Sequence, residues 1–515
     1  MGIPAREAET ECWAWKGSLM GRVAAFTFVR NEADDIGWWI SHHLAAGIST
    51  LIIYDNFSSD GTWAILQAAQ LTGRVHPLRA DAGLPQAERR DAAIRDALAR
   101  YGQTADWIGI LEIDEFVVFD DERAALGNVF DGLGDADAMA FSWCVFGSGS
   151  NVRRPRVSPL QAYDRHARAD FFLHERASLF YRTRAIDTAA VGTPFWGTPS
   201  ERIAMSYGSP AVIHEGSRIQ PNWHGARVRK YACRSMAHFL DRTRGLPQDG
   251  LADWWRTHDR NEDAIHVPGN AGAAAPFMHR LYRELWSRTI LRAQLAGVLN
   301  AASGDSGLVD RGEAAEAFTI HSSESGVIVY DVAQHALRAI PTETFEAEAP
   351  GAVGWESVFA FRWPAIADWV VLVRQGEGAF DQGQIGLMLG LMPLRAVPAG
   401  ADMIALQLPF NGRYMTAIPF NGQVTFDRQQ VQGWEQFTLR PAEATDVVRT
   451  RVGGIAALAR RGLSADGVRS GLTDIAIEQG EALAAVFAML SGADQQVLID
   501  AFPGCFPIWL RGPDA

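Results

Sequence analysis

The first third of the chain alternates short apolar runs with segments whose apolar residues recur at helical spacing. The apolar runs are Val23 to Val29, Thr50 to Tyr54 and Trp107 to Ile113, and Arg74 to Leu78 is a further short predicted strand. Helical spacing covers Ile36 to Ala46, Thr62 to Leu71 and the stretch from Pro85 to about Tyr101. Short apolar runs between helices are typical of strands buried in a parallel sheet. The pattern therefore predicts an α/β, Rossmann-like N-terminal domain with a mainly parallel sheet.

Polar residues follow three of these predicted strands at the point where each strand ends. They are Arg30-Asn31-Glu32, Asp55-Asn56, and the pair Glu112 and Asp114. Sheets of this kind bind ligands beyond the carboxyl ends of their strands. One polar group at a strand end is usual for a loop, whereas three on one edge predict a binding crevice.

The pattern changes after Ala296 to Ala315, a stretch rich in Gly, Ser, Ala and Asp that is typical of a linker. Phe318 to Pro441 has short apolar runs and many turns, which predicts a β-rich domain. Helical spacing returns from Val447 to Phe502 and predicts a small helical segment. We expect three domains, at residues 1–300, 313–442 and 443–515.

The β-rich stretch contains an internal repeat. Its first copy is Leu337 to Pro341, Thr344-Phe345-Glu346 and Gly354-Trp355-Glu356, and its second is Tyr414 to Pro419, Thr425-Phe426-Asp427 and Gly433-Trp434-Glu435. The two tryptophans are 79 positions apart, about twice the ~40 residues of a four-strand unit, so a third, degraded copy fits between them. Three such units predict a β-trefoil, and Asn411 to Tyr414 with Gly433 to Phe437 resembles a fascin-like β-trefoil repeat.

Charge and cysteine content narrow the classes of function. The 515 residues include 60 acidic and 47 basic side chains, a formal net charge of −13, which disfavours general binding to nucleic acid or anionic membranes. Basic residues nevertheless gather between Arg227 and Arg244, either as a solvated helix face or as a wall for a diphosphate. Four dispersed cysteines, no signal peptide and no transmembrane run predict a cytoplasmic protein.

Two carboxylates at the end of the fourth predicted strand are candidate metal ligands. On a strand, Glu112 and Asp114 would point to the same side, because side chains alternate. Oxygen ligands in such a pair suit Mg²⁺ or Mn²⁺, which usually bridges to substrate phosphates. Taken alone, Glu112 and Asp114 are more simply explained as a pair of solvated acids at a strand end.

The order of the motifs resembles the glycosyltransferase family 2-like and family 92-like group, whose fold is GT-A. The matching residues are Arg30-Asn31-Glu32, His42-His43 with Gly47, Ile53 to Thr62, Trp107 to Phe116, Trp143 with Phe146 to Gly149, and Lys230-Tyr231 with Ser235, Phe239 and Arg244-Gly245. The resemblance spans about Val23 to Gly250. The chain departs from the family pattern where Glu112 replaces an aspartate and Lys230 a histidine. A protonated lysine does not ligate a metal, although it can pair with a diphosphate as a point charge.

This resemblance implies a role for each candidate site residue. Nucleotide-sugar contacts would come from Arg30, Asn31, Glu32, Asp55, Asn56, Asp60, Glu112 and Arg234. Asp114 and Glu112 would hold a divalent cation, Mn²⁺ or Mg²⁺, and Lys230 would help to stabilise the leaving diphosphate. The general base stays open between Glu115, which is adjacent but could point away, and acids of the acceptor half such as Glu215. Asp60 is equally well explained as a helix N-cap.

The leading hypothesis is a hexosyltransferase-type enzyme that moves a sugar from a UDP-sugar to a glycan or other hydroxyl acceptor, with inversion and metal assistance. The alternative is a carbohydrate-binding or scaffolding protein whose GT-A domain is inactive, which the departures at Glu112 and Lys230 motivate. Nucleotidyl transfer is disfavoured because no N-terminal Gly-rich activating loop is present. Dinucleotide oxidoreductases and P-loop enzymes are disfavoured because GxGxxG and Walker sequences are absent.

Overall fold

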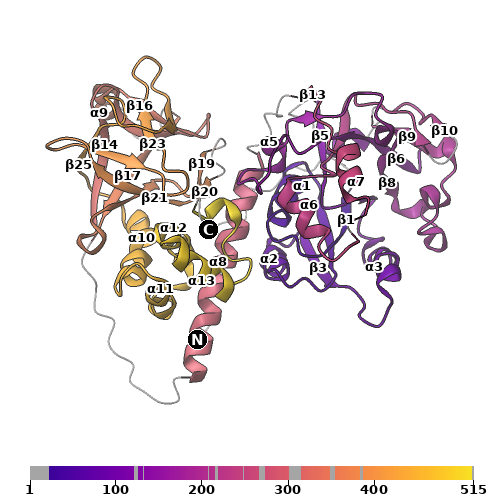
Figure 1. The fold of residues 1–515 in the computed structure, drawn as a ribbon, viewed down its shortest axis with the longest axis horizontal. Helices are drawn as coiled ribbons and strands as arrows, with labels where there is room; N and C mark the ends of the chain where they lie inside the picture. The colour runs from indigo at the N-terminus through magenta and orange to yellow at the C-terminus, as the bar shows by residue number, and fades with distance from the viewer. Residues whose placement is uncertain are drawn as a thin grey trace.

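The computed structural model describes residues 22–120, 126–130, 133–206, 208–214, 218–247, 249–265, 273–300, 315–347, 354–382 and 387–512. Figure 1 shows an α/β lobe and a β-rich lobe with the long helix α8, Ala275–Asn300, between them. Candidate base Glu215 lies outside the described residues, as does most of the predicted linker. The first part of that linker is helical, because α8 continues to Asn300.

The N-terminal lobe is built on a mixed sheet of nine strands in the order β3-β2-β1-β4-β8-β6-β12-β5, with β9 paired to β6. The strands are β1 Val23–Val29, β2 Thr50–Asp55, β3 Val75–Arg79, β4 Trp107–Ile110, β5 Glu115–Phe119, β6 Ala138–Val145, β8 Ala177–Arg182, β9 Ile203–Met205 and β12 Ala226–Lys230. The first four strands in the chain run parallel, and β8 then reverses direction. The predicted α/β architecture is confirmed.

Helices cover both faces of this sheet. Those of the lobe are α1 Ile36–Ala45, α2 Thr62–Ala69, α3 Gln86–Tyr101, α4 Leu126–Phe130, α5 Pro159–Ala162, α6 Met236–Arg242 and α7 Leu251–His258. Alternate residues of β1 pack on opposite faces of the sheet. Ala25 lies in the core with α1 and α2, whereas Phe26 lies in the core with α3. Two short pairs, β7 Arg165–His166 with β13 Asp263–Ala264 and β10 Ile213–His214 with β11 Arg218–Ile219, complete the lobe.

The β-rich lobe contains a closed ring of strands. Antiparallel pairing runs from β14 through β17, β18, β21, β22 and β25 back to β14. Two hairpins, β15–β16 and β23–β24, belong to the same sheet, and a third, β19–β20, forms a separate two-stranded sheet. The strands are β14 Glu316–Ser322, β15 Gly326–Asp331, β16 Ala336–Ile340, β17 Trp355–Arg362, β18 Trp369–Arg374, β19 Phe380–Gln382, β20 Leu387–Leu389, β21 Leu391–Pro398, β22 Ile404–Gln407, β23 Tyr414–Ala417, β24 Val424–Arg428 and β25 Phe437–Pro441.

The sequence repeat corresponds only in part to this arrangement. Trp355 begins β17 and Trp434 shortly precedes β25, and both strands belong to the ring. The upstream halves of the two copies differ, because Phe345 lies in the short helix α9, Thr342–Ala347, whereas Phe426 lies in strand β24. Similar residues in these upstream halves therefore form different elements. The Gly-Trp-Glu portions are the part of the repeat that is structurally related.

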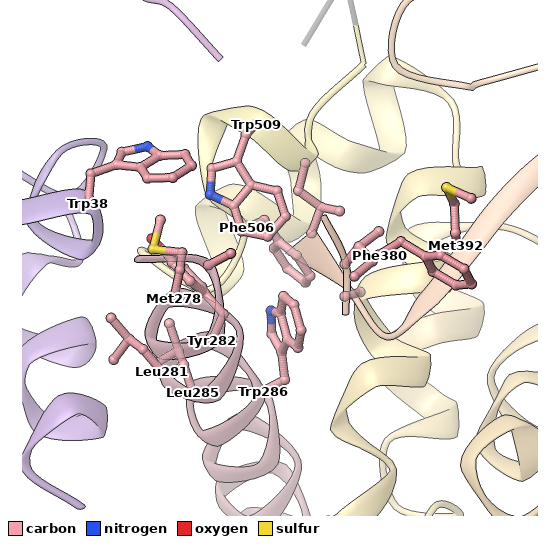
Figure 2. Packing of buried hydrophobic residues seen from close by; sticks show 14 of the residues in the cluster. Trp38, Met278, Leu281, Tyr282, Leu285, Trp286, Phe380, Met392, Phe506 and Trp509 are labelled. Atoms are coloured by element: carbon pink, nitrogen blue, oxygen red, sulfur yellow. The ribbon is translucent and has the colours of Figure 1, made fainter. Parts of the chain in front are cut away.

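The C-terminal segment is helical, as expected. Its helices are α10 Asp446–Ala459, α11 Ala465–Gly471, α12 Gly480–Met489 and α13 Gly492–Ala501. Helix α8 contacts α1 and α2 on one side and α12 on the other. Figure 2 shows buried side chains of α8, Tyr282 and Trp286 among them, next to Trp509 and Phe506 of the C-terminal segment. Apolar burial along α8 therefore joins the two lobes.

A close backbone approach ties the C-terminal segment to the loop before α2. Gly61 has φ +99°, and a Cβ added there would lie 2.2 Å from the backbone nitrogen of Gly504. Only glycine tolerates both this conformation and this proximity. The C-terminal segment thus packs directly against the loop that follows β2.

Candidate active site

The polar ends of the parallel strands meet at one edge, as the sequence predicted. Val29, the last residue of β1, pairs with Asp55, the last residue of β2. Strand β4 lies on the other side of β1, and the backbone nitrogen of Leu111 donates to the carbonyl of Phe26. The groups that follow β1, β2 and β4 therefore share one edge of the sheet.

The geometry of Glu112 and Asp114 differs from the prediction. Strand β4 ends at Ile110, and the chain turns before β5 begins at Glu115. The backbone nitrogen of Glu115 donates to the carbonyl of Glu112 at 3.1 Å, and the Glu115 carboxylate accepts from the nitrogen of Glu112 at 3.0 Å. The prediction of a strand through Ile113 was wrong, and strand alternation does not place the two acids on one side.

Lys230 is paired with the acids that follow this turn. Its Nζ lies 2.7 Å from Oδ1 of Asp114 and 3.2 Å from Oε1 of Glu115. Asp114 and Glu115 are buried, with 9% and 2% of their side chains exposed, and Lys230 is partly buried, with 12% exposed. Burial alone would raise the pKa of Asp114, but Lys230 and Arg234 outweigh it and lower that pKa. Asp114 therefore stays ionised beside the ammonium group.

Glu115 is held on both carboxylate oxygens. Oε1 accepts from Lys230, whereas Oε2 accepts from the backbone of Glu112 and from Ser178 at 2.9 Å. The same serine hydroxyl accepts from Nε1 of Trp143 at 2.8 Å. Burial raises the pKa of Glu115 above its ordinary value despite Lys230. With every oxygen engaged and 2% of the side chain exposed, Glu115 positions its neighbours and is poorly placed as a general base.

A second ion pair cluster lies beside the first. The guanidinium of Arg234 binds Glu32 at 2.6 Å and Asp35 at 2.8 Å, and His238 lies 2.9 Å from Asp35. Burial opposes the charge on Arg234, but the two carboxylates outweigh it and raise its pKa. Arg234 also has φ +54°, which is uncommon for a residue other than glycine.

These groups surround a cavity of about 580 Å³. Its polar walls are Glu32, Glu112, Asp114, Glu115, Lys230, Arg234, Arg242 and Arg90, and its aromatic walls are Phe28, Trp143, Tyr181 and Trp196. Lys230 lies 4.7 Å from the centroid of the Trp143 ring, a cation–π contact. Cations of the basic segment Arg227–Arg244 thus reach the cavity in part, through Lys230, Arg234 and Arg242.

The remainder of that basic segment serves other contacts. Arg227 pairs with Asp120 at 2.6 Å, and Arg244 pairs with Asp241 while 82% of its side chain stays exposed. Part of the segment is thus a solvated face, and part of it lines the cavity.

Asn31 and Asp60 organise the loops that follow β1 and β2. Oδ1 of Asn31 accepts from the backbone nitrogen of Ser59 at 2.8 Å. Asp60 accepts from Thr62 through one oxygen and from the backbone of Ala33, at 2.9 Å, through the other. The N-cap of α2 is Gly61, so Asp60 precedes the position predicted for it. Both side chains join the loop after β1 to the loop after β2.

Asp55 and Asn56 are buried at the end of β2. Arg79 pairs with Oδ2 of Asp55, which also accepts from the backbone of Ser58 at 3.1 Å. Oδ1 of Asp55 is buried without a hydrogen-bond partner, and Asn56 accepts from Arg89 at 3.2 Å. An unpaired buried carboxylate oxygen is costly, which makes Oδ1 a candidate ligand contact. Arg30 is exposed beyond the end of β1.

Sequence reasoning missed Arg90, Tyr181 and Trp196. Arg90 is one of several arginines on α3, and its pairing with Glu112 at 2.7 Å depends on how that helix crosses the sheet edge. Trp196 stacks on Tyr181 with ring centroids 4.5 Å apart, and it has φ +49°. The run Gly192 to Gly197, with two aromatic residues between glycines and a proline, was the available signal.

The carboxylates do not fit the predicted divalent cation. Asp114 is bonded to the ammonium of Lys230, and Glu112 is paired with the guanidinium of Arg90. A cation on these acids would meet a positive group already in contact with each one. Across the described ranges, no group of three or more His, Cys, Asp or Glu side chains is placed to hold a metal ion.

Comparison with known proteins supports a glycosyltransferase-like domain. The model of glycosyltransferase family 92 matches residues 23–161. A family 92 protein of Oryza sativa subsp. japonica is 30% identical over 93 residues, which span 18% of this chain and 15% of that protein. The resemblance to family 92 is thus confirmed for one stretch, and the chain matches a small part of this relative. Lys230 and Arg234 lie beyond the matched residues.

Similarity to solved structures is low. The crystal structure of S. aureus TarS matches over 82% of this chain and 96% of its own, with 8% identity and a TM-score of 0.24. Glucosyl-3-phosphoglycerate synthase from Mycobacterium tuberculosis, in complex with Mn²⁺, UDP and glucosyl-3-phosphoglycerate, matches over 36% and 69%, with 14% identity and a TM-score of 0.22. Among the helices of the described residues, none has the length and apolar content needed to span a bilayer.

Proposed function

We propose that this protein is a glycosyltransferase that moves a sugar from a UDP-sugar to a hydroxyl acceptor with inversion. One observation carries the proposal: the 580 Å³ cavity places cations and carboxylates at the carboxyl edge of the parallel strands. The stretch that matches family 92 supplies Glu32, Glu112 and Asp114 to that cavity. Pockets at this edge are the usual ligand sites of α/β sheets.

The nucleoside would lie toward the ends of β1 and β2. Oδ1 of Asp55 has no hydrogen-bond partner there, and an N–H of the base or a hydroxyl of the ribose would supply one where local movement uncovers this buried atom. Loop contacts of Asn31 and Asp60 would keep this region in place, since they join the two strand ends. Pre-ordered loops lower the entropy cost of binding.

The diphosphate would lie against the cations of the cavity. Lys230, Arg234 and Arg242 line one wall, and each is a donor for phosphate oxygens. When the bond from the anomeric carbon to the diphosphate breaks, its electron pair moves to the phosphate oxygen. Fixed cations aimed at this developing charge are an effective form of electrostatic catalysis.

Glu112 is the carboxylate best placed to act as the general base. Its side chain is 43% exposed, whereas those of Glu32, Asp114 and Glu115 are 15%, 9% and 2% exposed. Its cationic partner in the ion pair, Arg90, is itself 41% exposed at the cavity wall. In one displacement, the acceptor oxygen forms its bond to the anomeric carbon, the proton passes to Glu112, and UDP leaves from the opposite face. This replaces the expectation for Glu115.

The β-rich lobe is proposed to be a β-trefoil that binds glycan. Support comes from its six-strand ring and three hairpins. Phe420 is 79% exposed beside Trp434, whose indole donates to Glu324 at 3.2 Å. An exposed aromatic face next to a carboxylate suits a sugar ring. A glycan array checks this: binding by the wild type and loss in Phe420→Ala are expected, and equal signals from both would refute it.

The transferase proposal is tested by UDP release from a panel of UDP-sugars, with and without candidate acceptors. Release by the wild type is expected, and Glu112→Gln should lower kcat by about 100-fold or more without weakening UDP binding. Arg256→Met is a control, since Arg256 is exposed and pairs with Asp253. UDP binding with no sugar release from any donor would favour the alternative of an inactive, carbohydrate-binding domain. Absence of both would refute the assignment of the cavity.

A further inference from the structure

Lysine is almost absent from this chain. The sequence has two lysines, Lys16 and Lys230, against 45 arginines. Lys16 lies outside the described residues, so Lys230 is the single lysine of the described ranges. A sequence that uses arginine at nearly every basic position keeps lysine at the wall of its cavity. This exception to arginine usage is consistent with a requirement for an ammonium group at this position.

The surroundings of Lys230 explain this requirement. Its Nζ is confined between Asp114 at 2.7 Å, Glu115 at 3.2 Å and the Trp143 ring, whose centroid is 4.7 Å away. Lys230 is the last residue of β12, where it pairs with Glu115 on β5 and Val145 on β6. A backbone fixed on both sides leaves little freedom to accommodate a larger head group. Arginine carries a planar fork, whereas the ammonium is a compact point charge.

A compact point charge on two carboxylates is also what a bound divalent cation provides. Such ions bind oxygen ligands at about 2.0–2.6 Å, and Oδ1 of Asp114 already bonds the ammonium. Asp114 and Glu115 lie 2.7 and 3.2 Å from the ammonium, and carboxylates at these distances favour its charged form. The cavity therefore has a permanent cation on the acid that the sequence predicted as the main metal ligand.

We propose that Lys230 takes the place of the divalent cation, so that UDP binding and sugar transfer need no metal. The inference rests on the proposed function and adds that the reaction does not require a metal cofactor. The ammonium would hold the terminal phosphate of UDP, and Asp114 and Glu115 would hold the ammonium. When the anomeric C–O bond breaks, the electron pair becomes a charge on the phosphate oxygen next to Nζ. Lys230 keeps its proton, and no further co-reactant is required.

Calorimetry of UDP binding to the full-length wild type, in excess EDTA and then in MnCl₂ or MgCl₂, tests the inference. Equal affinity, within about threefold, is expected in all three solutions, because contacts to charged groups contribute tenfold or more. Binding that requires Mn²⁺ or Mg²⁺ would overturn the inference and leave the proposed function standing. No binding in any of the three solutions would remove the proposed function and the inference with it.

Variants at Lys230 give a second measurement. Lys230→Met is expected to weaken UDP binding in EDTA by about tenfold or more, and Lys230→Arg to fail to restore it. Arg256→Met serves as the control for loss of a cation elsewhere. The two lysines also allow a direct readout without mutation, since selective ¹³C-lysine labelling yields two Cε resonances. UDP should shift one of them in EDTA, and an unchanged spectrum with UDP bound would overturn the inference.

Discussion

Removal of Lys230 has a consequence for stability that can be worked out from its contacts. Lys230→Met leaves Asp114 and Glu115 buried without their shared partner, with 9% and 2% of their side chains exposed. Breaking a buried pair by removing one partner costs about 3–5 kcal/mol. The lower end applies here, because Arg234 also acts on Asp114 and because Glu115, whose pKa is already raised by burial, can take up a proton.

A double-mutant cycle isolates this interaction. Asp114→Asn in the Lys230→Met background removes one of the uncompensated charges, so the double variant should be more stable than the sum of the single effects by about 1–3 kcal/mol. A loss of about 3 kcal/mol of local stability in Lys230→Met should increase the population of the locally open state about 100-fold. Strands β5 and β12 pair from Glu115 to Phe119, so their amides should report the change.

Hydrogen exchange with mass spectrometry on peptides of β5 and β12 is the suitable assay. It reports local opening, whereas global unfolding of a chain with two lobes is not expected to be two-state. The β16 hairpin, in the other lobe, supplies control peptides that should not change. Additive single effects, or unchanged exchange in Lys230→Met, would refute the claim that this pair is a coupled buried unit.

Two further predictions concern the junction of the lobes. Gly61→Ala should lower the local free energy of opening, measured by hydrogen exchange in peptides of α2, by about 3 kcal/mol, because the new Cβ would lie 2.2 Å from the backbone nitrogen of Gly504 in addition to the positive-φ strain. Gly73→Ala, with φ +71° and open space, should lose only about 1 kcal/mol in the same assay. Glu481, bound by His279 at 2.5 Å and by Arg451, has its pKa lowered from 4.5 to about 2. Its stabilising effect is complete above pH 4.5 and is lost as pH falls toward 2, so thermal melts of Glu481→Gln should show a smaller acid decline than the wild type. Equal losses of stability in the two glycine variants would contradict the first prediction. Parallel declines in melting temperature with falling pH, in Glu481→Gln and the wild type, would contradict the second.

Much of the N-terminal lobe could be predicted from sequence because its strands are continuous apolar runs. Burial on both faces leaves a pattern that needs no knowledge of distant contacts, and β1 and β2 begin where the apolar runs begin. The end of β4 could not be predicted in this way. There, the carboxylate of Glu115 accepts a hydrogen bond from the backbone of Glu112, and the strand ends three residues earlier than its apolar character indicates.

The candidate site was predictable at the level of strand ends and less so for individual contacts. Lys230 and Asp114 are 116 positions apart, and nothing in local periodicity reports that they touch. The same holds for Arg90 with Glu112, because the contact depends on the path of α3. Asn31 and Asp60 show the opposite case, in which residues that match a family motif are fully engaged in holding loops together.

The position of UDP in the cavity tests the central claim most directly. A crystal structure of the wild type grown with UDP and EDTA should place the diphosphate within hydrogen-bond distance of Nζ of Lys230, with the nucleoside toward Asp55. Addition of MnCl₂ should leave that position unchanged and add no ion at Asp114. UDP bound elsewhere, or a metal ion between Asp114 and the diphosphate, would contradict the account.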